Sequence, residues 1–93
     1  MRNIRLTIEY DGTAYAGWQS QSGKHRSIQE TIEIALRRIL QEEVKLIGAG
    51  RTDSGVHAEG QVANFKADSS LPLKNIQKAL NSLLPRDIVI VDI

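Results

Sequence analysis

The sequence has no cysteine, only two prolines and only four aromatic side chains among its 93 residues. The lack of cysteine excludes disulfide bonds, thiolate nucleophiles and cysteine metal sites, and it fits a cytoplasmic protein. No apolar run approaches the roughly 20 residues of a membrane-spanning helix, and residues 1–10 lack the apolar stretch of a signal peptide. We therefore expect one small cytoplasmic domain with a largely aliphatic core and no membrane partner.

Neither sign of charge dominates. Twelve Lys and Arg residues oppose eleven Asp and Glu residues, which gives a net charge of +1. This balance excludes the strongly basic composition that by itself indicates a nucleic-acid-binding protein, so any contact with RNA has to be local. Hydrophobic residues at 41% and charged residues at 25% are typical of a folded globular chain.

The pattern of apolar residues predicts six elements of secondary structure. Strands are expected over residues 4–10, 44–48, 61–66 and 88–93, and amphipathic helices over 27–42 and 73–84. Ser27 followed by Glu30 has the spacing of a capping box at the start of the first helix. The order β-α-β-β-α-β predicts an α+β, ferredoxin-like split βαβ fold, in which both helices cover one face of an antiparallel sheet and the other face stays open.

Two segments without periodicity are candidates for a functional site. Residues 12–26 form a loop longer than the roughly 12 residues that are usual in a compact domain. Within it, the basic run Lys24–Arg26 lies near Tyr15 and Trp18, a mixture of cations and rings that binds unstacked RNA bases. The alternative for Trp18 is a partly buried side chain that anchors the loop.

The second segment, residues 48–55, contains three glycines and precedes His57. It lacks the Gly-Lys-Ser/Thr ending of a phosphate-binding P-loop, and no helix begins there as a dinucleotide site requires. A metal site or a Ser-His-Asp triad is poorly supported by the spacing. What remains is a loop that presents a cation, Arg51, beside a carboxylate, Asp53, and that could hold and act on an anionic substrate. The alternative is a turn stabilised by the side chains of Asp53 and Ser54.

The same segments resemble a known family. Ile8–Gly12, Gly17–Gln19, Ser27–Glu30 and above all Gly50–His57, which reads Gly-Arg-Thr-Asp-Ser-Gly-Val-His, are similar to the N-terminal half of the tRNA pseudouridine synthase A family. The resemblance runs over essentially the whole chain, in order. The Gly50–His57 block is highly specific, whereas the other motifs alone are only suggestive.

The resemblance implies isomerisation of uridine to pseudouridine in the anticodon arm of tRNA, without a metal or an organic cofactor. It implies that Asp53 is the catalytic carboxylate and that Arg51 contacts RNA and supports flipping of the target base. The further residues expected to bind RNA are Thr52, His57, Trp18, Gln19, Lys24 and Arg26. Residues 1–93 would be the N-terminal ferredoxin-like half of the catalytic domain, with the second half absent. This half alone would be inactive, and the full-length enzyme would be a homodimer.

Two other classes of protein fit the topology without catalysis. A non-catalytic module that binds RNA or another ligand would depend on Trp18 and the basic run, and Asp53 would be dispensable. A protein-interaction domain would dock its partner on the open face of the sheet, and neither Arg51 nor Asp53 would affect RNA.

Overall fold

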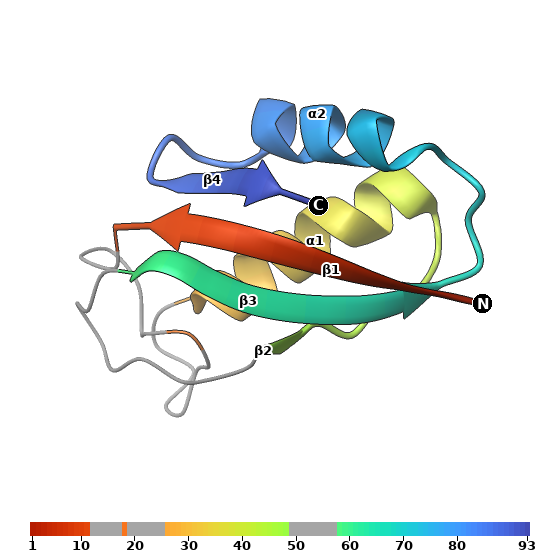
Figure 1. Ribbon diagram of the computed structural model, residues 1–93, viewed down its shortest axis with the longest axis horizontal. Coiled ribbons are helices and arrows are strands. Elements are labelled where there is room, and N and C mark those ends of the chain that lie inside the picture. Colours follow the sequence, from red (N-terminus) through yellow and green to blue (C-terminus); the bar gives the residue numbers. More distant parts are fainter. Residues whose placement is uncertain (12–17, 19–25, 49–57) are drawn as a thin grey trace.

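The computed structural model describes residues 1–11, 18, 26–48 and 58–93. Its elements are, in order, β1 (Arg2–Tyr10), α1 (Ile28–Leu40), β2 (Ile47–Gly48), β3 (Ala58–Ala67), α2 (Leu73–Leu83) and β4 (Ile88–Asp92) (Figure 1). The strands form one antiparallel sheet in the order β2-β3-β1-β4. Figure 1 shows β1 and β3 crossing in front of α1, with α2 beside α1 and next to β4. The predicted ferredoxin-like α+β fold is confirmed.

The core lies between the sheet and the two helices. Alternate residues of β1 are buried from Ile4 to Tyr10, and the register places Ile4 opposite Phe65 and Leu6 opposite Ala63, so these side chains share one face of the sheet. The helices cover that face with fully buried side chains, namely Ile28, Ile32 and Leu36 of α1 and Ile76 and Leu80 of α2. As predicted from the few aromatic residues, the core is mainly aliphatic.

The helix starts and ends follow local signals. Ser27 has an extended backbone and its Oγ accepts a hydrogen bond from the Glu30 N–H at 3.0 Å, which is one half of the predicted capping box. The first helix ends at Leu40, two residues earlier than predicted, because Gln41 adopts a left-handed conformation with φ of 57°. None of the described helices is long and apolar enough to cross a membrane.

The strand predicted over residues 44–48 is shorter than expected, because only Ile47–Gly48 pair with β3. The backbone of Leu46 instead binds side chains of α1. Its N–H donates to Glu33 Oε2 at 2.8 Å, and its carbonyl accepts from Gln29 Nε2 at 2.7 Å. We call these two side chains the α1 clamp. Val44 and Leu46 remain buried, so the apolar pattern predicted their burial correctly and their pairing wrongly.

A matching arrangement holds the opposite edge of the sheet. Asn81 Oδ1 accepts from the Ile90 N–H at 2.8 Å, and the Ile90 carbonyl accepts from Asn81 Nδ2 at 3.0 Å and from Gln77 Nε2 at 3.1 Å. We call Gln77 and Asn81 the α2 clamp. In both clamps, two side chains four residues apart on a helix bind the backbone of one residue in the segment that follows. Such bonds occupy backbone groups through which another strand could otherwise pair.

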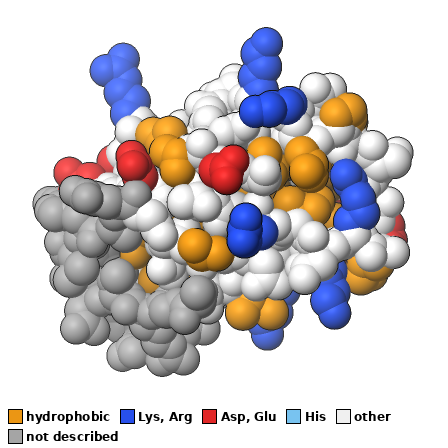
Figure 2. All heavy atoms as spheres, viewed as in Figure 1, with side chains coloured by type: hydrophobic (Ala, Val, Ile, Leu, Met, Phe, Trp, Pro, Cys, Tyr) orange, Lys and Arg blue, Asp and Glu red, His pale blue; other side chains and the backbone are white. Residues whose placement is uncertain are grey.

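As predicted, none of the described helices or strands covers the face of the sheet opposite α1 and α2. Four apolar side chains on this face are 37–57% exposed, namely Ile47, Val62, Val89 and Val91. Polar and charged residues of β1 and β3, such as Arg5 and Lys66, alternate with the buried positions. Figure 2 shows apolar side chains lying between Lys and Arg side chains on the surface seen in that view.

Candidate functional site

The structure describes both ends of the segment that contains the Gly50–His57 block, but not the block itself. The predicted site residues Arg51, Thr52, Asp53 and His57 lie outside the described residues, as do Gln19 and Lys24. The segment leaves the sheet after Gly48 in β2 and returns at Ala58 in β3, which pairs with Tyr10 at the end of β1. The described residues therefore show how the chain is held at the two ends of this segment, Gly48 and Ala58.

Trp18 is part of the core rather than the surface. Its side chain is 2% exposed, and its ring lies 6.3 Å from the Tyr10 ring, measured between centroids, at an interplanar angle of 31°. Its carbonyl accepts a hydrogen bond from the Gln29 N–H at 3.0 Å. A nucleic-acid base stacks only on a ring face that it can reach. The burial therefore favours the anchoring interpretation of Trp18 over a stacking role.

The indole of Trp18 lies directly against the backbone of Gly48. A Cβ atom at position 48 would stand 2.4 Å from Trp18 Nε1, 2.6 Å from Trp18 Cε2 and 2.9 Å from Gln61 Nε2. Real Cβ atoms essentially never approach other heavy atoms this closely. Glycine is thus required at position 48 by a side chain thirty residues earlier in the chain. The sequence marks this glycine only as part of a glycine-rich segment.

Gly48→Ala is expected to lower the free energy of unfolding by about 1–3 kcal/mol, because either the buried indole or the β2 backbone must move. Gly60→Ala is the matched control, since a Cβ atom at position 60 meets nothing within 4 Å. Urea denaturation of both variants checks the expectation. Equal stability of the two variants would contradict the close approach of Trp18 and Gly48.

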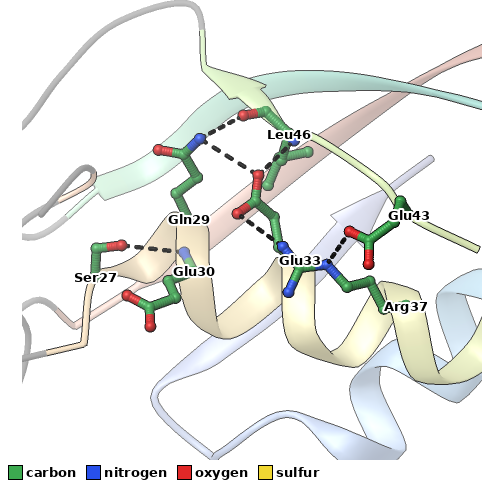
Figure 3. A network of polar contacts seen from close by, with 7 residues as sticks. All are labelled: Ser27, Gln29, Glu30, Glu33, Arg37, Glu43 and Leu46. Carbon is green, nitrogen blue, oxygen red and sulfur yellow. Dashed lines mark hydrogen bonds and ion pairs between the residues drawn. The ribbon is translucent and has the colours of Figure 1, made fainter.

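The α1 clamp belongs to a network of polar side chains along α1 (Figure 3). Glu33 also lies 3.9 Å from Arg37, measured from Oε1 to Nη2, and Arg37 lies 3.3 Å from Glu43. A hollow of about 450 Å³ beside the network is lined in part by these side chains. The helical pattern predicts that Glu33 faces away from the core. Its bond to the Leu46 N–H joins residues 13 positions apart, so the local pattern of the sequence does not contain its role.

A further described carboxylate, that of Glu42, also serves the fold. Glu42 accepts hydrogen bonds from the backbone N–H groups of Asp68 and Ser69, at 2.9 and 3.1 Å. Within the described ranges, no three His, Asp or Glu side chains are grouped so that they could hold a metal ion. Asp53 lies outside these ranges, and its catalytic role stays a prediction from the motif.

Arg26 is the one predicted basic site residue that the structure describes. It is exposed, and with Arg38 it lines a groove of about 180 Å³ between α1 and the end of α2, where Ile34 and Leu83 are also exposed. Neither arginine takes part in an ion pair among the described residues. A guanidinium group binds phosphate through two parallel hydrogen bonds. Arg26 is thus available to an anion, and its contact with RNA stays a prediction.

Comparison with known proteins agrees with the motif. Residues 6–93 match the family model described as tRNA pseudouridine synthase. The chain is 56% identical over 92 residues to tRNA pseudouridine synthase A 2 of Clostridium perfringens, covering 99% of this chain and 37% of that protein. It is 60% identical over 91 residues to tRNA pseudouridine synthase A of Thermodesulfovibrio yellowstonii, covering 98% and 35%.

A third relative, tRNA pseudouridine synthase A of Caldicellulosiruptor bescii, is 60% identical over 92 residues, with 99% of this chain and 37% of that protein covered. The chain therefore spans little more than a third of the length of the curated relatives it matches. The match to the family model includes residues 6–10 of β1, both helices and the whole Gly50–His57 block. The chain belongs to the tRNA pseudouridine synthase A family.

Proposed function

We propose that this chain is the part of a tRNA pseudouridine synthase that carries the catalytic aspartate, Asp53, and that the whole protein converts uridine to pseudouridine in the anticodon arm of tRNA. The observation that carries the proposal is the Gly50–His57 block inside the region matched by the family model. The relatives are named as tRNA pseudouridine synthases, which supports the reaction and the class of RNA.

The proposed chemistry needs a carboxylate and no cofactor. Asp53 drives cleavage of the N-glycosidic bond, either by attacking the sugar or the base or by taking a proton from the sugar. The detached uracil rotates and rejoins the ribose through carbon five. The hydrogen on that carbon leaves as a proton, and N1, which is no longer bonded to the sugar, takes up a proton, so the composition is unchanged and the reaction is an isomerisation. The target base must leave its stack first, and Arg51 supports that step. A hydrogen bond from Arg51 would also keep Asp53 ionised.

The whole protein is proposed to be larger than the chain. The chain covers 35–37% of its relatives. In line with the family resemblance, residues 1–93 are proposed to form the N-terminal half of the catalytic domain. A second half and a second subunit would complete the surface that holds tRNA. We propose a homodimer in the cytoplasm, with Arg26 and residues of the 12–26 loop among the RNA contacts.

The test uses full-length protein and a tRNA transcript that carries tritium at carbon five of its uridines. Bond formation at that carbon releases tritium to water, so we expect release in proportion to pseudouridine formed. Binding of tRNA without release would instead favour the non-catalytic RNA-binding module. Neither binding nor release would favour a protein-interaction domain.

A further inference from the structure

The chain is fixed on several sides just before it enters the segment that carries Asp53. The α1 clamp binds both backbone groups of Leu46. Ile47 and Gly48 pair with Asn64 and Ala63 of β3. The indole of Trp18 then lies against Gly48, where no side chain fits. Three successive residues are thus held by a helix, a strand and a buried ring.

Gln29 links two of these contacts. Its backbone N–H donates to the Trp18 carbonyl at 3.0 Å, while its side-chain amide donates to the Leu46 carbonyl at 2.7 Å. The other end of the segment is tied to the same group, because Ala58 pairs with Tyr10 and the Tyr10 ring contacts Trp18. The first turn of α1 is therefore connected to both ends of the segment that contains Asp53.

From these contacts we propose that Gln29 and Glu33 are positioning residues for the reaction of Asp53. They act through Leu46 by fixing the direction in which the chain leaves β2. The proposal rests on the proposed function, since it assigns a role to side chains that support the same site. A misplacement of about 1 Å at a catalytic group can cost about a hundredfold in rate. Loss of the bonds that hold Leu46 is therefore expected to slow the chemical step.

The α2 clamp provides a control within the same molecule. Gln77 and Asn81 have the same spacing on their helix and likewise bind both backbone groups of one residue, Ile90, with Asn81 binding both groups and Gln77 adding a second bond to the carbonyl. Ile90 lies in β4, at the opposite edge of the sheet from β2. Loss of either clamp should cost similar stability, but only the α1 clamp leads into the segment with Asp53.

The experiment compares two double variants of the full-length protein, Gln29→Ala/Glu33→Ala and Gln77→Ala/Asn81→Ala. It is done at a temperature at which urea denaturation shows that both double variants are folded. We expect kcat for tritium release to fall between about tenfold and a hundredfold in the first variant, with KM for tRNA unchanged. The second variant is expected to keep both constants. Glu33→Gln retains an oxygen that can accept from the Leu46 N–H, so it should keep most of the activity.

Equal kcat values in the two double variants would overturn the positioning role, and so would a rise in KM alone in the first variant. If a double variant does not fold, Glu33→Ala and Asn81→Ala replace the pair, with the same expected contrast. A wild-type protein that releases no tritium would contradict the proposed function itself. Tritium release by the wild-type protein is therefore measured before any variants are compared.

Discussion

Asp53→Asn in the full-length protein is expected to reduce tritium release from tRNA by about a thousandfold or more, because the amide can act neither as a nucleophile nor as a base. The substitution removes the charge and keeps the size of the side chain. Asp53→Ala should abolish conversion as well and leave the fold intact. Urea denaturation and a tRNA-binding measurement on the same samples separate loss of chemistry from loss of structure or affinity.

Asp68→Ala is the matched control for removal of a carboxylate. The side chain of Asp68 is 73% exposed and lies 3.9 Å from the amino terminus, a contact of little energetic value. This variant should keep full activity. Retained activity in Asp53→Asn would contradict the mechanism and would favour a module that binds RNA without acting on it.

The isolated 93-residue chain is expected to form no detectable pseudouridine although it folds. Its core is closed by two helices on one face of the sheet, with Leu6, Ile8, Leu36 and Leu80 fully buried, so circular dichroism and a cooperative urea transition should report a folded domain. Its relatives, however, are almost three times as long. We expect the remaining length to supply groups that hold the flipped base and the tRNA.

The measurement is tritium release at enzyme concentrations equal to those of tRNA, so that even a single turnover is detected. The full-length protein serves as the positive control. Pseudouridine formed by the isolated chain would contradict the division of the site between two halves. Activity restored by adding the remainder of the protein as a separate chain would support that division.

Local patterns in the sequence predicted most of the fold correctly. The alternation in residues 61–66 predicts that Ala63 and Phe65 share one face of a strand, and the structure buries both. The strand extends to Ala58–Ala67, where Ala58 pairs with Tyr10. The strand over residues 44–48 was the exception. Its apolar residues are equally compatible with packing against a helix, and the bonds from Gln29 and Glu33 that decide the matter come from side chains more than ten residues away.

The candidate site, like the fold, was predictable where a local motif is sufficient and not where remote segments pack together. The Gly50–His57 block identifies the family and suggests Asp53, since a motif needs no geometry to be read. The role of Trp18 could not be decided from its neighbours in sequence, because the partners that bury it, Tyr10 and Gly48, come from two separate strands. Packing between remote segments is what a local pattern does not contain.

Trp18 is the only tryptophan in the chain. In the isolated 93-residue chain, all of the indole fluorescence therefore comes from one side chain, which is shielded from water and touches Gly48, just before the segment that carries Asp53. The emission of an indole shifts to longer wavelength when water reaches the ring. The isolated chain thus contains its own optical reporter beside Gly48, and its emission follows, without a label, the exposure of this part of the core to water during unfolding.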